Sequence, residues 1–312
     1  MIRAKLKGNG AWLAVAILVI IPAIVFKEKF FSLTNLLNVL RQSSMIGLIS
    51  IGMTCVIITA GIDLSVGATV ALSAVIAAML TSRSIVLAIF IPLVIGVTIG
   101  LINGVIITKL KVVPFIATLA VQMAVRGIAY IITDLKSVAV AEDALPFIFI
   151  GRGYLFGIPV PIIILVIAAV IMIMTCKRTT FGRSLYAIGG NEDAARKMGL
   201  RVDRNIILVY ILTGLFSALA GIILCSRLGA GQPVSGSGWE MDSISSVAIG
   251  GTLLTGGVGS IEKTMAGILI TTLIGNIINL QGDINSYVQK IIMGAIVLVV
   301  ILVQKRTMEK EN

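Results

Sequence analysis

The sequence predicts an all-α protein that crosses a membrane about ten times. Of its 312 residues, 58% are hydrophobic and only 12% are charged, whereas about 25% of the residues in soluble domains are charged. Apolar runs of roughly 17 to 25 residues, the length of a helix that spans a bilayer, recur along the whole chain. Basic residues gather beside the ends of these runs. Together these observations predict a polytopic membrane protein that forms a single domain over 1–312.

The predicted spans divide into two groups of five. The first group falls in a unit of about 1–133 and the second in a unit of about 157–304, followed by a C-terminal tail at 305–312. The ten predicted spans are 11–26, 36–58, 64–80, 84–108, 114–133, 157–175, 206–226, 241–256, 264–280 and 287–304.

The distribution of basic residues predicts that both termini are cytoplasmic. With the N-terminus inside, sixteen Lys and Arg residues fall in inside segments and six in outside segments, as the positive-inside rule requires. The net charge of +11 therefore reflects membrane topology. The basic residues form no stripe with interleaved aromatics, so we expect the bilayer, and no nucleic acid, as their partner.

Several kinds of chemistry lack the residues they need. There is no histidine, and the three cysteines have no C-x-x-C spacing, so neither a metal site nor a disulfide is predicted. The segment from Gly257 to Thr264 approaches a phosphate-binding loop, but Glu262 replaces its second glycine, and a carboxylate there would repel phosphate. We therefore expect no catalytic residues, no ATPase site and no cofactor bound by this chain.

A weak internal repeat relates the two halves. Ala60–Gly67 matches Gly250–Gly257 in the placement of glycine and hydroxyl residues. With five spans in each half, the second copy would cross the membrane in the opposite sense, which gives two inverted repeats. The alternative is that these glycines serve only to let helices pack closely.

A polar stretch at 176–205 separates two long apolar runs and contains a short predicted helix with both ends marked. Asn191 is a suitable N-cap, acids follow in the first turn, bases occupy the last turn, and Gly199 is suited to the position after the C-cap. Its small apolar side is expected to consist of Ala194, Ala195 and Met198. We predict that this helix receives force from a partner; the alternative is a basic loop that only fixes topology. Its residues are Asn191, Glu192, Asp193, Ala194, Ala195, Arg196, Lys197, Met198 and Gly199.

Polar residues inside spans are costly and are therefore candidates for a translocation path. Asp63, followed by Ser65, is either a helix N-cap or a substrate contact. Gln122 and Arg126 are one helical turn apart, so they face the same side; Arg126 either lines a path or extends to the outer headgroups. The predicted path residues are Asp63, Ser65, Thr118, Gln122 and Arg126.

Two longer segments, 133–157 and 227–241, are predicted on the outside. They are either plain connectors or a rim on which an extracytoplasmic protein docks. The candidate docking residues are Gln232, Ser235, Trp239 and Glu240. For Trp239 the alternative is an ordinary place in the aromatic belt at the membrane interface.

Five motifs carry a family resemblance that covers about 34–304. TAGIDLSVGATVAL and GRSLYAIGGNEDAARKMGLRV form a specific pair, and three further motifs occur in the same order. With these motifs the chain resembles the membrane permeases of ribose-type ABC importers, which take up monosaccharides with the help of a binding protein. The three further motifs are PFIATLAVQMAVRGI, GQPVSGSGWEMDSISSVAIGGTLLTGGVGS and LQGDINSYVQKIIMGAIVLVVIL.

The resemblance implies a multi-pass protein of the bacterial inner membrane that conducts a small sugar such as ribose. It also implies a second permease copy or a homologous permease, in a homo- or heterodimer. Cytoplasmic ATP-binding subunits would carry ATP and Mg²⁺, and a periplasmic or lipid-anchored protein would deliver the sugar. The short helix at 191–199 would dock in a cleft of the ATPase. The rival reading is an ion-coupled secondary carrier or facilitator for a small polar solute.

Overall fold

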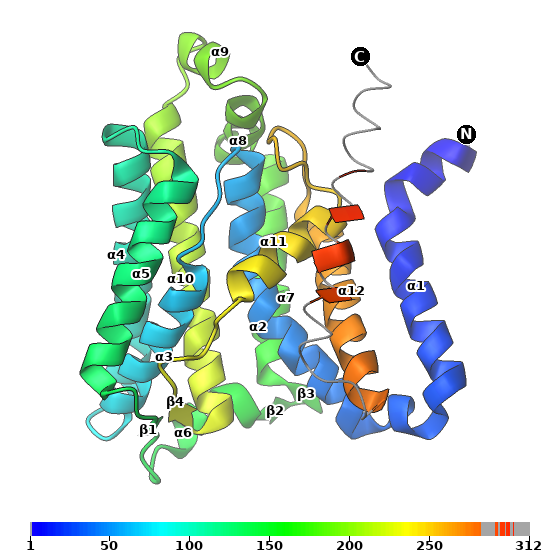
Figure 1. Cartoon of the computed structure of the whole chain (residues 1–312), viewed down its shortest axis with the longest axis vertical. Coiled ribbons are helices and arrows are strands. Elements are labelled where there is room, and N and C mark those ends of the chain that lie inside the picture. The colour runs from blue at the N-terminus through cyan, green and yellow to red at the C-terminus, as the bar shows by residue number, and fades with distance from the viewer. Residues whose placement is uncertain (1, 282–290, 293, 297, 300–301, 303–312) are drawn as a thin grey trace.

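A computed structural model describes residues 2–281, 291–292, 294–296, 298–299 and 302. Figure 1 shows a bundle of upright helices, with shorter helices and loops at both ends. The start of α1 lies at the same end of the bundle as α8 and α9, which agrees with the predicted topology (Figure 1). The tail at 305–312 and most of the predicted tenth span lie outside the described residues.

Long helices make up most of the described chain. They are α1 (Ile2–Phe31), α2 (Leu33–Ile58), α4 (Ile85–Lys109), α5 (Pro114–Thr133), α7 (Val160–Arg178), α10 (Val202–Leu228) and α12 (Ile261–Gln281). The shorter helices are α3 (Val66–Thr81), α6 (Leu145–Arg152), α8 (Thr180–Gly190), α9 (Glu192–Lys197) and α11 (Trp239–Ile249). Four two-residue strands complete the described structure: β1 (Val138–Ala139), β2 (Tyr154–Leu155), β3 (Ile158–Pro159) and β4 (Ala230–Gly231).

Six described helices are long and apolar enough to cross a membrane, judged by length and composition alone: α2, α4, α5, α7, α10 and α12. A seventh span results if Ala11–Ile20 and Pro22–Phe31, which meet at a bend of 70°, act together. At 16 residues, α3 is shorter than the roughly 20 residues that cross a bilayer, and α11 has only 11.

The predicted eighth span at 241–256 is wrong in its second half. Helix α11 ends at Ile249, and an irregular segment follows from Gly250 to Ser260. Gly251, Gly256 and Gly257 all have positive φ there, a backbone conformation that glycine adopts readily and that ends a helix.

The protein core surrounds α2. Every residue of this helix from Ser43 to Ile58 is buried, and α10, α7, α11 and α12 all contact it. Helices α4 and α5 carry exposed apolar side chains on their outer faces, among them Phe90, Met123 and Ile131. Helices that expose apolar side chains around a buried centre suit a hydrocarbon solvent.

Close packing of α4 against α10 depends on small residues at every fourth position. A Cβ atom added at Gly96, Gly100 or Gly104 would overlap the backbone of Gly214, Tyr210 or Ile207 on α10. Missing side chains of this kind let membrane helices approach at backbone distance. Part of the glycine content thus serves packing.

At the end of the bundle opposite α9, the two long predicted loops are joined. Strand β1 pairs antiparallel with β4, with Val138 opposite Gly231. Helix α6 is fixed to α10 because Ser226 Oγ donates to the carbonyl oxygen of Phe147 at 2.6 Å and accepts from the amide of Gly151 at 2.7 Å. The segment 133–157 and the part of 227–241 around β4 therefore form one rim, and the chain after β4 runs back into the bundle to α11 (Figure 1).

Candidate functional site

Helix α9 has the ends that the sequence predicts. The Asn191 side-chain oxygen accepts a hydrogen bond from the amide of Ala194 at 2.8 Å, and Glu192 and Asp193 occupy the first turn. Gly199 follows with a φ of 83°, the left-handed conformation in which a glycine ends a helix. So short a helix gains little from intrinsic propensity, so its caps and tertiary contacts hold it in place.

A chain of charged residues fastens α9 to α10 and α4. Arg196 donates to Glu192 at 3.0 Å and to Asp203 at 2.8 Å, and the second oxygen of Asp203 accepts from Lys109 at 2.9 Å. The hydrogen bonds to Asp203 and Glu192 raise the pKa of Arg196. Exposed ion pairs add little stability, so this network mainly sets the position of α9.

The expected apolar side of α9 is split. Ala195 is completely buried in the main core, with the amide of Leu200 donating to its carbonyl oxygen at 3.2 Å. Ala194 is exposed, and 69% of Met198 is accessible. The structure thus places Ala195 inward and leaves Ala194 and Met198 on the outer surface.

Helix α8 precedes α9 and was not predicted. The Thr179 side chain caps it by accepting from the amide of Gly182 at 3.1 Å. Leu185 and Ile188 are buried, and Phe181 packs against the same core. The sequence does contain a signal for this helix: Thr179 is followed by Phe181, Leu185 and Ile188 at helical spacing. The signal is weak because basic residues surround these positions.

The C-terminal end of α8 touches two glycine-rich breaks at once. The first break, Thr59–Ser65, separates α2 from α3, and the second is the irregular segment after α11. A Cβ on Gly189 would overlap the carbonyl oxygen of Ile58, and the amide of Gly257 donates to that same oxygen at 2.9 Å. The end of α8 therefore contacts the second break at Gly257 and the last residue of α2, next to the first break.

Side chains add further contacts around the place where α8 meets Ile58 and the second break. Tyr186 on α8 donates from its hydroxyl to the carbonyl oxygen of Gly259 at 3.1 Å. Burial raises the pKa of Tyr186 to about 12, so the phenol keeps the proton that it donates. Lys177 at the end of α7 pairs with Glu262 at the start of α12.

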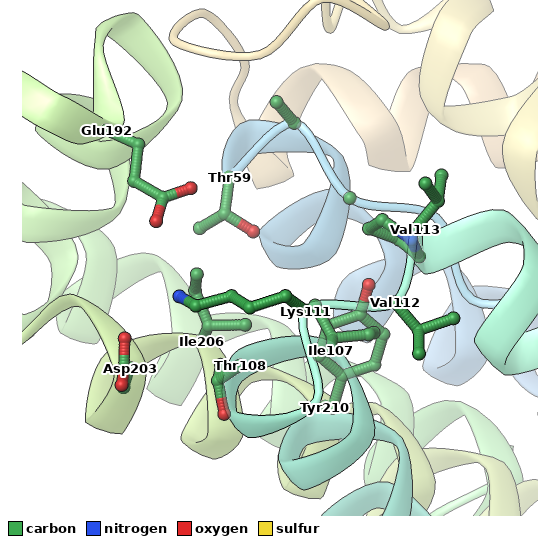
Figure 2. A pocket seen from close by; sticks show the side chains of 13 residues that line it. Thr59, Ile107, Thr108, Lys111, Val112, Val113, Glu192, Asp203, Ile206 and Tyr210 are labelled. Carbon is green, nitrogen blue, oxygen red and sulfur yellow. The ribbon is translucent and has the colours of Figure 1, made fainter.

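A cavity of about 300 Å³ lies between α9 and the first break. Figure 2 shows the Lys111 side chain extended across it toward Glu192 and Asp203, with Thr59 on the facing wall. Tyr210 closes the cavity toward the interior and donates to the carbonyl oxygen of Ile62 at 3.2 Å.

Deeper in the bundle, Asp63 belongs to a closed hydrogen-bond network. One carboxylate oxygen of this buried residue accepts from the Ser65 amide at 2.9 Å and from the Ser65 hydroxyl at 2.6 Å. Asn103 on α4 donates to Ser65 Oγ at 2.8 Å, and Thr118 accepts from the amide of Leu64 at 3.1 Å. Asp63 is not the N-cap of α3, because Ser65 occupies that position and Asp63 bonds to it from the turn before the helix. The network brings Asp63, Ser65 and Thr118 together; it also includes Asn103, an amide within an apolar run that was not predicted.

Gln122 faces the first turn of α11 and Arg126 faces the segment before it, so the two lie on the same side of α5, as their one-turn spacing predicts. Gln122 donates to Glu240 at 3.4 Å. Arg126 Nη1 donates to the carbonyl oxygens of Pro233 and Ser235 at 2.8 and 2.6 Å. Arg126 is therefore held by two backbone carbonyl oxygens of the protein.

The four candidate docking residues lie at different depths. Gln232 is exposed and Ser235 is half-buried. Trp239 packs against the main core, and Glu240 is buried with one carboxylate oxygen that has no hydrogen-bond partner among the described residues. Gln232 is thus the exposed member of the four, and Ser235 and Trp239 are both half-buried.

These features define a multi-pass helical membrane protein with a capped helix exposed at one end. Comparison with known proteins then identifies the family. Residues 35–301 match the family described as branched-chain amino acid transport system / permease component, and the chain belongs to this family of transport permeases.

Curated relatives match almost the whole chain. A ribose import permease protein of Bacillus subtilis is 46% identical over 299 residues, which cover 95% of this chain and 92% of the relative. A ribose import permease protein of Haemophilus influenzae is 42% identical, over 94% and 91% of the two chains. An L-arabinose transport system permease protein of Escherichia coli is 37% identical, over 93% and 88%. No solved structure matches the chain.

Proposed function

We propose that this chain is the permease subunit of an ATP-driven sugar importer in the bacterial inner membrane. The identity to ribose and L-arabinose permeases over almost the whole chain supports a monosaccharide substrate. The observation that carries the mechanism is the contact of α8 with both glycine-rich breaks, next to the exposed helix α9.

In this proposal the membrane domain has ten spans in two inverted repeats of five. The six full-length helices would be joined by α1, by the short helices α3 and α11 beside irregular segments, and by a span near the C-terminus. Discontinuous helices of this kind are typical of transport paths.

ATP binding and hydrolysis belong to partner subunits, which would hold ATP and Mg²⁺. Closure of those subunits would press on the outer face of α9, where Ala194 and Met198 are exposed. Because Gly189 lies against Ile58, the push would reach the first break and then Asp63 and Ser65. A partner changes a conformational equilibrium only through contacts that differ between the states, so the ATP-binding subunits would have to contact α9 differently when the packing of Gly189 against Ile58 changes.

The remaining partners follow from the same mechanism. A second permease, identical or homologous, would complete the path, and a periplasmic or lipid-anchored binding protein would dock on the rim that contains Gln232 and Ser235. The path would include Asp63, Ser65, Thr118, Gln122 and Arg126, whose amides, hydroxyls and carbonyl neighbours suit a neutral sugar. Glu240 would contribute its free carboxylate oxygen to the same path.

Reconstitution tests this function. Proteoliposomes that contain the chain, ATP-binding subunits and a binding protein should take up D-ribose only when ATP is present on the side of α9. Uptake by the chain alone, driven by an ion gradient, would instead support a secondary carrier.

A further inference from the structure

The cavity beside α9 lies between elements of the coupling route, but the proposed function gives the cavity itself no role. Its walls come from the first break, the segment between α4 and α5, the start of α10, and α9 itself. Its volume of about 300 Å³ lies at the lower end of the range of about 300–1,000 Å³ found for small-molecule sites.

The wall combines hydrogen-bonding groups with an apolar surface. Lys111 extends into the cavity and makes no ion pair within the described residues. The hydroxyls of Thr59 and Thr108 donate to backbone carbonyls at 2.8 and 2.7 Å, so each oxygen keeps a lone pair for a ligand. Ile206 and Tyr210 provide apolar area.

The charges at this wall select the class of ligand. Glu192 and Asp203 line the cavity, whereas Arg196 and Lys109, which pair with them, do not. A ligand therefore meets the carboxylate oxygens first, which disfavours an anion, while the ammonium group of Lys111 disfavours a cation. A neutral polyol both donates to carboxylates and hydroxyl oxygens and accepts from an ammonium group. We propose that this cavity binds the transported monosaccharide from the cytoplasmic side.

Occupancy would slow transport, an inference that rests on the proposed function. A sugar in the cavity would link Glu192 on α9 to Lys111 and Thr59, which belong to different parts of the membrane domain. Transport requires α9 to move relative to these residues, so a ligand that binds only this arrangement shifts the equilibrium toward it. Accumulated sugar would thus inhibit its own import.

Right-side-out membrane vesicles that contain the complete transporter can measure this effect. The vesicles are loaded with ATP and either unlabelled D-ribose or, as an osmotic control, sucrose; the initial rate of labelled D-ribose uptake is then recorded. We expect lumenal ribose, but not sucrose, to lower the rate several-fold in the natural protein. Lys111→Gln should require roughly tenfold more lumenal ribose for the same inhibition, because a hydrogen bond from a charged donor is lost.

Two further variants test whether inhibition depends on the cavity. For each variant, the rate of D-ribose uptake is compared with the rate of the same variant in ribose-free vesicles. Thr59→Val removes a second polar group from the cavity and should also weaken inhibition. Lys263→Gln removes an exposed lysine that does not line the cavity and should leave inhibition as it is.

Equal inhibition of the natural protein, Lys111→Gln and Thr59→Val would overturn the proposal, as would a natural protein that is insensitive to lumenal ribose. Absence of ATP-dependent uptake even in ribose-free vesicles would overturn the proposed function, and this inference with it.

Discussion

The amide of Gly257 donates a hydrogen bond to the carbonyl oxygen of Ile58 at 2.9 Å, and Gly189 lies against that same oxygen. Ile58 ends α2, while Gly257 belongs to the break before α12. Three segments that are remote in sequence therefore meet at one backbone atom. The sequence predicts that the two breaks resemble each other; the structure shows in addition that they touch.

This contact predicts that Gly189→Ala uncouples transport. The added methyl group would displace α8 from Ile58, because backbone atoms surround the site and cannot move aside independently. Overpacking of this kind costs about 1–3 kcal/mol. We expect ATP-dependent D-ribose uptake in reconstituted vesicles to fall at least several-fold while membrane insertion persists.

The neighbouring Gly190 offers a matched control. A Cβ there meets no atom within 4 Å, so Gly190→Ala should retain uptake close to that of the natural protein. Equal loss in both variants would show that general helix stiffness, rather than contact with Ile58, limits transport.

A second prediction concerns the charged network of α9. Arg196→Glu replaces two ion pairs with repulsion from Glu192 and Asp203, so α9 should leave its position against α10 and α4. Because Arg196 and Glu192 are exposed and Asp203 is only partly buried, the melting temperature of the isolated permease should change little. Stimulation of the partner ATPase by loaded binding protein should instead be lost.

Lys197→Glu tests whether ATPase stimulation depends on which basic residue of α9 is reversed or only on the total charge of this helix. Lys197 makes no ion pair within the described residues, so its reversal should reduce ATPase stimulation less than Arg196→Glu does. Similar losses would favour the alternative in which the loop only fixes topology.

Local sequence signals predict where α5 and α9 begin and end, but they do not predict which side of α9 faces inward. The bounds of α5 at Pro114–Thr133 follow from an apolar run, and α9 follows from its caps. The inward side of α9 was not predictable, because Ala194 and Ala195 are chemically identical and only the chain packed beneath them distinguishes the two.

Long-range pairings gave no local signal. Strands β1 and β4 have two residues each, too few for an alternating pattern. The contact of Gln122 with Glu240 is another such pairing. The sequence assigns Gln122 to the translocation path and Glu240 to the docking site on the outer rim, so it does not predict that they meet. Hydropathy also could not set the length of α11, because a glycine has the same hydropathy in a helix as in a turn. Gly251, Gly256 and Gly257 after Ile249 adopt positive φ, which hydropathy does not reveal.

The opposite exposure of Ala195 and Met198 gives a third prediction. Met198→Asp changes an exposed side chain, so it should weaken co-purification of the ATP-binding subunits without lowering the melting temperature of the permease. Ala195→Trp forces a large ring into the core and should lower that melting temperature instead. If Met198→Asp leaves subunit association intact, the partner contacts another surface.

The fourth prediction concerns Arg126, which holds the segment before α11 through two backbone carbonyl oxygens. Arg126→Met retains most of the side-chain volume but leaves the carbonyl oxygens of Pro233 and Ser235 without this donor. Since unpaired buried acceptors are costly, the segment should open more often, and hydrogen exchange at 232–238 should become faster. Met123→Gln, a polar change on the exposed face of the same helix, should leave that exchange unaltered. Unchanged exchange in Arg126→Met would mean that the strand pair β1–β4 alone holds this segment, and that Arg126 is free to serve another purpose at the membrane surface.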